Sequence, residues 1–314
     1  MRRIGRSAGA PSEGKRGSEG TEMASHRLID ELVAEGPVLT DGAWGTELQS
    51  RGIAPGEMPD LWNLSHPDRV EEVARAYVDA GSRIVLTNTF RANRLAFAGN
   101  PEVERIPEIN RAGVEISKRA AGEAARVFAS IGPSGKQLVT REVTEEQLAA
   151  AFQEQASAQA EAGADAIVVE TMMDLTEAKL AVEAALATGL PVVACMVFDS
   201  GKNKDRTMMG VGTEQAAEAL TALGADVIGA NCGLGVEEYV PVCASLAAAT
   251  DRPIWIKANA GIPQLVNGKV VYQTTAAEFA GCLPKLLEAG ASFVGGCCGT
   301  DPTFIAALRA ALAN

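Results

Sequence analysis

Short apolar runs alternate with longer stretches of helical periodicity from about residue 37 to the end of the chain. Most of these runs are apolar almost throughout, as are strands buried on both faces of a parallel sheet. We identify eight predicted strands: Val38–Thr40, Ile84–Thr87, Val127–Ile131, Ala166–Glu170, Val192–Val197, Val227–Asn231, Ile254–Lys257 and Ser292–Gly295. The pattern therefore predicts eight consecutive strand-helix units.

The segments between the runs carry the signals of amphipathic helices. Val70, Val73, Ala74 and Tyr77 fall at i, i+3, i+4 and i+7, which places them on one face of a helix. Helix starts with capping residues are predicted at four places: Ser65-x-x-Asp68, Thr144-x-x-Gln147, Thr275-x-x-Glu278 and Asp301-Pro302.

A weak internal repeat narrows the fold class. A glycine of the kind that ends helices precedes every second run: Gly81, Gly163, Gly224 and Gly290. Eight units with this alternation predict a single α/β domain, a (β/α)8 TIM barrel over residues 23–314, with a doubly wound open sheet as the alternative. Residues 1–22 are polar and glycine-rich, and we expect a disordered tail there.

Composition excludes several classes of protein. The net charge of −12 argues against a nucleic-acid partner, which needs a basic face. No apolar run approaches the roughly 18 residues of a membrane span. Six cysteines in 314 residues are too few for a secreted disulfide scaffold, so we expect a cytoplasmic protein with free thiols.

Three of the cysteines follow predicted strands. Cys232 comes directly after the sixth run, and Cys297 and Cys298 come directly after the eighth. The carboxyl ends of barrel strands share one rim, so these sulfurs would converge. Three protein ligands with an open fourth position are typical of catalytic zinc, and a soft sulfur site suits a thiolate substrate. The other three cysteines are predicted to lie in the core: Cys195, Cys243 and Cys282.

Other strand ends carry groups suited to an amino acid. Asp41 follows the first run and Glu170 ends the fourth, so their carboxylates would receive an ammonium group. Glycines such as Gly42 let backbone N–H groups approach a carboxylate closely. Asn267-Gly268, between apolar pairs, predicts a hairpin beside the site that would act as a lid.

The strand-end motifs are together similar to the homocysteine S-methyltransferase family, and most similar to the homocysteine-binding domain of cobalamin-dependent methionine synthase. The resemblance covers residues 36–312 and rests on six motifs in order: Asp41-Gly42-Ala43-x-Gly45-Thr46, Thr87-Asn88-Thr89-Phe90, Glu170-Thr171, Asn231-Cys232-Gly233, Asn259-Ala260-Gly261 and Gly295-Gly296-Cys297-Cys298-Gly299-Thr300.

The resemblance implies a role for each matched residue. It implies a (β/α)8 barrel with Zn²⁺ held by Cys232, Cys297 and Cys298, and the homocysteine amino group held by Asp41 and Glu170. We predict further substrate contacts at three matched positions: Gly42, Asn231 and Thr300.

The predicted reaction is methyl transfer to homocysteine, which gives methionine. A free thiol has a pKa near 8.5, and zinc coordination would deprotonate the substrate sulfur as the fourth ligand. The sequence contains no folate or cobalamin module, so the donor stays open between S-methylmethionine, S-adenosylmethionine and methylcobalamin on a corrinoid partner protein. Direct use of methyltetrahydrofolate is least favoured.

Three alternatives differ in chemistry. Another small thiol would fit the same metal site. A Schiff-base lyase would use Lys257 at the end of the seventh run, but that leaves the three thiols without a role. A protein that only binds zinc or thiols would carry the cysteines without transferring a methyl group.

Overall fold

The computed structural model describes residues 27–54, 56–266 and 269–313. Within them, eight parallel strands form one sheet in the order β1-β10-β7-β6-β5-β4-β3-β2. The strands are β1 (Val38–Leu39), β2 (Ile84–Val85), β3 (Arg126–Ile131), β4 (Ala166–Met172), β5 (Val192–Met196), β6 (Val227–Gly235), β7 (Ile254–Asn259) and β10 (Ala291–Gly296). The predicted tail over residues 1–22 and the predicted domain start at residue 23 lie outside the described residues.

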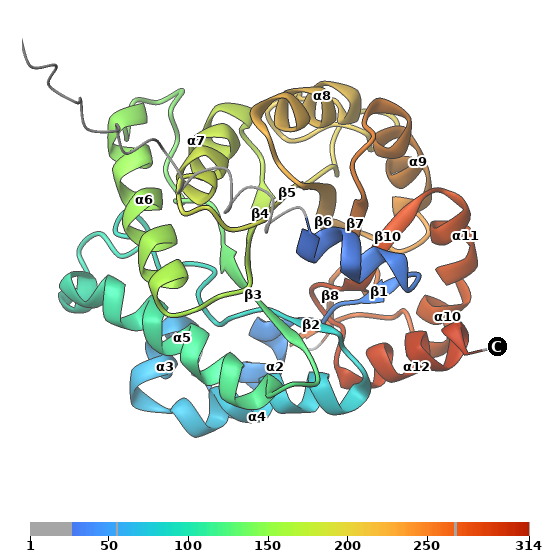
Figure 1. The fold of residues 1–314 in the computed structure, drawn as a ribbon, viewed down its shortest axis with the longest axis horizontal. Coiled ribbons are helices and arrows are strands. Elements are labelled where there is room, and N and C mark those ends of the chain that lie inside the picture. The colour runs from blue at the N-terminus through green and yellow to red at the C-terminus, as the bar shows by residue number, and fades with distance from the viewer. Residues whose placement is uncertain (1–26, 55, 267–268, 314) are drawn as a thin grey trace, which may run out of the picture.

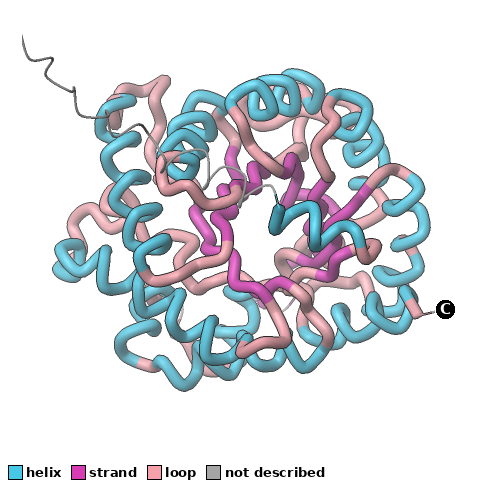
Figure 2. Tube along the Cα trace, viewed as in Figure 1, coloured by secondary structure: helices cyan, strands magenta, loops and turns pink. Residues whose placement is uncertain are grey.

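The sheet curls into a nearly closed barrel with helices outside it (Figures 1 and 2). β1 pairs with β10, and β2 pairs with β3. Between β1 and β2, the backbone N–H of Arg83 donates to the carbonyl of Leu39 at 2.8 Å. The predicted (β/α)8 barrel is confirmed, because an open doubly wound sheet would leave its edge strands apart.

Helices follow the strands as the periodicity predicted. The apolar face formed by Val70, Val73, Ala74 and Tyr77 is buried. No helix in the described part of the chain is long and apolar enough to cross a bilayer. The helices are α2 (Trp44–Ser50), η1 (Pro59–Leu61), α3 (Trp62–Ser65), α4 (Pro67–Ala80), η2 (Pro101–Arg105), α5 (Ile106–Ala121), α6 (Glu145–Glu161), α7 (Leu175–Leu186), α8 (Thr213–Leu223), α9 (Tyr239–Ala249), α10 (Ala276–Gly281), α11 (Leu283–Glu288) and α12 (Pro302–Leu312).

Three of the four predicted helix starts are confirmed. Thr144 and Thr275 each make both hydrogen bonds of a capping box. Asp301 caps α12 by accepting a hydrogen bond from a first-turn backbone amide. The prediction at Ser65 is wrong, because this residue ends α3 and α4 begins two residues later at Pro67.

A helical segment that the strand-helix pattern did not assign closes one end of the barrel. Residues 27–34 are helical, and this segment crosses the ring of strands in Figure 1. Ile29 and Leu32 join an apolar cluster with side chains from the strands, among them Phe128, Trp255 and Phe293. These strand residues come early in their strands, so the segment covers the amino end and the site develops at the carboxyl end.

The predicted hairpin is present after β7. β8 (Gln264–Val266) and β9 (Lys269–Val271) pair in antiparallel register. Its predicted turn, Asn267-Gly268, lies outside the described residues. Tyr272, which follows β9, packs so close to Gly299 that a Cβ at that glycine would overlap its ring. The hairpin is thereby anchored beside the loop that carries the two adjacent cysteines.

Candidate active site

Three cysteines converge at the carboxyl rim of the barrel. The Sγ atoms of Cys232, Cys297 and Cys298 all lie within 4.8 Å of one another. Those of Cys232 and Cys298 are 3.9 Å apart. A tetrahedral zinc ion with Zn–S bonds of about 2.3 Å holds its sulfurs about 3.8 Å apart, so the spacing fits a single metal ion.

The backbone at Cys232 adopts a conformation that non-glycine residues rarely accept. Its φ is +65°, in the left-handed region, and the following Gly233 has a φ of +71°. Such a conformation costs about 1–3 kcal/mol and is maintained where the surroundings demand it. The hydroxyl of Tyr239 donates to the carbonyl of Cys232 at 2.5 Å and holds this turn in place. The strain therefore serves to aim one thiol at the other two.

Hydrogen bonds among the three thiols shift their pKa values in opposite directions. Hydrogen bonds from Cys297 and Cys298 lower the pKa of Cys232 to about 3. The bond to Cys232 raises the pKa of Cys298 to about 11, and the pKa of Cys297 is also raised by its bond to Cys232. Because cysteine ligands bind metal as thiolates, a bound dication would release protons from this cluster.

A cavity of about 350 Å³ opens above the three cysteines and is lined by them. It also meets two charged side chains from the strands, Glu170 and Lys257, and Gly42 from the loop after β1. Three further lining residues escaped the sequence reasoning: Asp60, Arg91 and Ser130. Among these, Ser130 carried a readable signal, because it is the polar residue within the apolar run Val127–Ile131.

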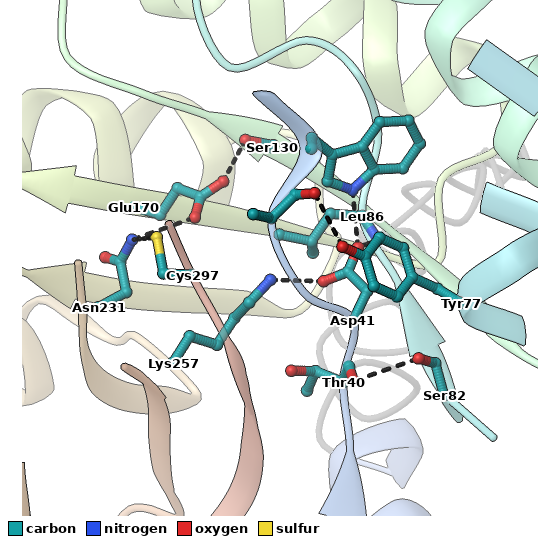
Figure 3. A network of polar contacts seen from close by, with 12 residues as sticks. Thr40, Asp41, Tyr77, Ser82, Leu86, Ser130, Glu170, Asn231, Lys257 and Cys297 are labelled. Atoms are coloured by element: carbon teal, nitrogen blue, oxygen red, sulfur yellow. Dashed lines mark hydrogen bonds and ion pairs between the residues drawn. The ribbon is translucent and has the colours of Figure 1, made fainter. Parts of the chain in front are cut away.

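Glu170 is linked to the cysteine cluster through Asn231. It is 8% exposed, and Ser130 donates to its Oε1 at 2.5 Å while Asn231 donates to its Oε2 at 3.2 Å (Figure 3). Burial raises its pKa, opposed by the charge of Lys257 and the bond from Ser130. Asn231, a predicted substrate contact, is buried and lies 4.0 Å from the Cys297 sulfur.

Asp41 is fully buried and already surrounded by donors. Its Oδ2 accepts from the indole N–H of Trp44 at 2.7 Å and from the backbone N–H of Leu86 at 2.8 Å. Its Oδ1 forms an ion pair with the ammonium of Lys257 (Figure 3). Asp41 does not line the cavity, whereas Lys257 does. Three of the roughly four acceptor positions of this carboxylate are therefore already used by the protein.

Thr300 joins two loops of the site. Its hydroxyl donates to the carbonyl of Cys297 at 2.8 Å and accepts from the backbone N–H of Ala43 at 3.2 Å. A Cβ at Gly42 would lie 2.8 Å from that hydroxyl, so only glycine fits there. Gly42 lines the cavity, and Thr300 lies behind it. The structure thus brings Thr300 to the site as a support of the cysteine loop.

The remaining cysteines lie apart from this cluster. As predicted, they are buried: Cys195, Cys243 and Cys282. Burial raises the pKa of the Cys195 thiol and raises that of Cys243 to about 12, so neither is a reactive thiol.

Asp60 is a second buried carboxylate in the cavity lining, and its burial predicts a pH-dependent stability of the folded protein. It is 2% exposed, and burial raises its pKa from 3.8 to about 6, opposed by the backbone N–H and the charge of Arg91. A raised folded-state pKa means that stability is full below pH 4 and falls as pH rises through 6. Between pH 4 and 7 we expect wild type to lose about 3 kcal/mol relative to Asp60→Asn, at about 1.4 kcal/mol per pKa unit.

Urea unfolding of both proteins across this pH range measures the difference. Asp79→Asn, at an exposed position of α4, is the matched control and should follow wild type. Parallel stability curves for wild type and Asp60→Asn would show that burial does not perturb this carboxyl.

Comparison of the sequence with protein families and characterised relatives adds an independent finding. The sequence model described as homocysteine S-methyltransferase matches residues 38–312. The methionine synthase of Mycobacterium tuberculosis is 32% identical over 307 residues, which cover 91% of this chain and 25% of that protein. The methionine synthase of Mycobacterium leprae is 31% identical over 301 residues, with 90% and 25% covered. The chain spans about a quarter of the length of these relatives.

Solved structures show the same fold. The metallated form of the homocysteine methyltransferase MmuM from Escherichia coli superposes with a TM-score of 0.74 at 24% identity, covering 91% of this chain and 99% of that one. Its oxidized form gives a TM-score of 0.73 at 24% identity, with 90% and 99% covered. At this level of identity, the likeness establishes a common barrel architecture.

Proposed function

Because the chain belongs to the homocysteine S-methyltransferase family, as its motifs predicted, we propose that it transfers a methyl group to the thiol of homocysteine and forms methionine. We further propose that the reaction depends on Zn²⁺ bound by Cys232, Cys297 and Cys298. The observation that supports this most strongly is the convergence of three sulfurs, spaced for one metal ion, on the floor of a cavity that also holds buried charges.

The fit of the site to zinc comes from its donor set. Within the described part of the chain the cluster comprises three thiols, which would leave one tetrahedral position of a zinc ion for substrate. All three cysteines line the cavity from which a substrate would arrive. Zinc bound there would act as a Lewis acid that keeps the substrate thiol deprotonated at neutral pH. Without such help, only a few per cent of an alkyl thiol is thiolate at pH 7.

The side chains of the chain would orient the amino acid for attack. Glu170 carries a negative charge toward the cavity, and Ser130 and Asn231 hold its two oxygens. Holding the substrate at its amino group directs its sulfur toward the cysteines and the incoming methyl group. In the reaction the sulfur–carbon bond forms as the donor–carbon bond breaks, and the donor departs with the electron pair. No side-chain base is needed for this step.

The methyl donor divides the proposal into two versions. A small sulfonium compound, S-methylmethionine or S-adenosylmethionine, would leave as a neutral thioether. A methylcorrinoid carried by a partner protein would agree with the much longer methionine synthases that this chain matches over a quarter of their length. The cavity of about 350 Å³ would hold the amino acid, and a corrinoid would have to approach from outside it.

A Schiff-base lyase is disfavoured by the surroundings of Lys257. Burial would lower the pKa of this amine, but the carboxylates of Asp41 and Glu170 outweigh burial and raise it. Schiff-base formation needs a neutral amine, which lysine lyases obtain by lowering that pKa. The ion pair therefore keeps Lys257 protonated and unreactive.

Zinc content and methionine formation together test the proposed function. Purified protein with zinc and homocysteine is offered S-methylmethionine, S-adenosylmethionine or free methylcobalamin, and methionine is quantified. We expect about one zinc per chain and methionine from one donor class. Turnover with methylcobalamin alone would identify a corrinoid partner as the source. Bound zinc with no product from any donor would contradict methyl transfer and favour a zinc- or thiol-binding protein.

A further inference from the structure

The hairpin after β7 places a tyrosine against the loop that carries two of the cysteines. Tyr272 directly follows β9, and its ring packs over Gly299, where a Cβ would overlap the ring atoms. Gly299 also has a φ of +83°, a conformation that favours glycine. The glycine that follows Cys298 is therefore the residue that admits the tyrosine ring.

Backbone hydrogen bonds hold the hairpin and the cysteine loop together. The N–H of Ala260 donates to the carbonyl of Cys298 at 3.0 Å, and the N–H of Thr274 donates to the carbonyl of Ala260 at 3.2 Å. Ala260 precedes the hairpin and Thr274 follows it, so the chain on both sides is tied to this loop. The position of Tyr272 is thus set by the fold of the rim.

The hydroxyl of Tyr272 donates a hydrogen bond to the sulfur of Cys298. The side chain is half-buried and packs against the apolar core of the barrel, so its ring is supported on more than one side. A hydrogen bond to the charged form of a group stabilises that form. Tyr272 would therefore stabilise the thiolate of Cys298 that a metal ion requires.

The other two sulfurs of the cluster also have side-chain donors. Asn259, the last residue of β7, hydrogen-bonds to Cys232. The amide nitrogen of Asn231, in β6, lies 4.0 Å from the sulfur of Cys297 and donates to it. When metal binding removes the thiol protons, the S–H donors within the cluster are lost, and these donors from outside it remain.

These donors reach the sulfurs from behind the cavity. All three cysteines line the cavity, whereas its lining within the described part of the chain does not include Tyr272, Asn231 or Asn259. A substrate sulfur in the open metal position would arrive from the cavity side. The cysteine sulfurs would then be hydrogen-bonded, while the substrate sulfur would lie on the side away from these donors.

A zinc site with a bound substrate thiol would hold four thiolates, and each is a nucleophile. The nucleophilicity of a thiolate falls as its pKa falls, and a hydrogen bond to the sulfur acts in that direction. We propose that Tyr272 protects Cys298 from methylation through its hydrogen bond and so directs the methyl group to the substrate sulfur. This inference rests on the proposed function. Tyr272 acts through Cys298, so it is a positioning residue and not a catalytic one.

Methylation of the wrong sulfur would damage the metal site. The sulfur of Cys298 would attack the methyl carbon, a new S–C bond would form, and the donor would leave with the electron pair of the broken bond. The product is a neutral thioether in place of the charged thiolate that binds zinc. Loss of the protecting hydrogen bond therefore predicts methylation of Cys298 followed by release of zinc.

Reaction of the zinc-loaded protein with methyl iodide, in the absence of homocysteine, tests this role. Tyr272→Phe keeps the ring over Gly299 and removes only the hydroxyl. Mass spectrometry locates methylation at Cys298, and a chromogenic chelator follows the release of zinc. Both should be about 3–10-fold faster in the variant than in wild type, the effect of one hydrogen bond of ordinary strength. Iodide is the leaving group, so no biological donor or partner protein is required.

Cobalt substitution gives a readout that a change in packing alone would not produce. In Co²⁺-loaded Tyr272→Phe, the sulfur-to-cobalt charge-transfer band should move to longer wavelength, because a thiolate without the hydrogen bond gives up an electron more easily. The matched control, Tyr77→Phe, removes a hydroxyl that donates to the carbonyl of Ala43, and it should behave as wild type in both measurements. An unshifted band and an unchanged rate of Cys298 methylation in Tyr272→Phe would overturn the proposal.

The two proposals fail differently. Faster methylation of Cys298 in Tyr272→Phe, without methionine from any of the three biological donors, would contradict methyl transfer and support the role of Tyr272. Methionine formation with equal methylation of Cys298 in variant and wild type would contradict the role of Tyr272 alone. In wild type with bound homocysteine, methylation of Cys298 as fast as that of the substrate would also overturn this role, even if the variant does not fold.

Discussion

Replacing Cys298 with alanine is expected to abolish zinc binding and methyl transfer together. The variant would leave Cys232 and Cys297 as the only sulfurs of the cluster, and two protein ligands cannot hold a tetrahedral ion against water. Loss of even a hydrogen-bond partner of a metal ligand lowers metal affinity or activity about 10–100-fold, so loss of a ligand itself should lower them further. Metal content after dialysis against a chelator and the rate of methionine formation measure both effects.

The structure supplies a matched control for this variant. Cys243 is a fully buried cysteine in α9, outside the cluster. Cys243→Ala also removes one cysteine sulfur, but from a buried position outside the cluster. This variant should therefore retain both zinc and activity. Retention of one zinc per chain by Cys298→Ala, or equal loss in both variants, would show that the rim thiols are not the metal site.

Replacing Asp41 with asparagine should destabilise the folded protein by about 3–5 kcal/mol, the cost of leaving one member of a buried ion pair alone. Asp41 is 0% exposed and Lys257 is 2% exposed, so solvent compensates poorly for the lost carboxylate. The new amide also has one oxygen where the carboxylate has two. Its N–H₂ must face either Lys257 or the donors Trp44 and Leu86.

Urea unfolding at pH 7 measures this loss, and the double variant Asp41→Asn/Lys257→Met tests its cause. Replacing a buried ion pair by neutral groups of similar volume is often close to neutral, so the second change should restore most of the stability. If the double variant is no more stable than Asp41→Asn, the loss comes from the bonds to Trp44 and Leu86. Wild-type stability in Asp41→Asn would mean that the pair contributes nothing.

The fold followed from local patterns in the chain. Continuous apolar runs, helical periodicity and the recurring helix-ending glycines each act over a few residues, and together they required eight strand-helix units. The same locality explains the error at Ser65, where two short helices meet and the cap signal did not show which helix it served. The helical segment over residues 27–34 precedes the first unit of the repeat, so the repeat did not reveal that it covers the barrel's amino end.

The sequence alone determined which residues reach the rim, because the end of a strand is a local property and all strands of a barrel point the same way. The three thiols and Glu170, which it placed at strand ends, line the same cavity in the structure. Which rim residues touch one another was decided only by the tertiary structure. The ion pair between Asp41 and Lys257 joins residues 216 positions apart, and it depends on the register and closure of strands that are distant along the chain. For that physical reason, sequence patterns could suggest a carboxylate for substrate at Asp41 but could not show its ion pair with Lys257.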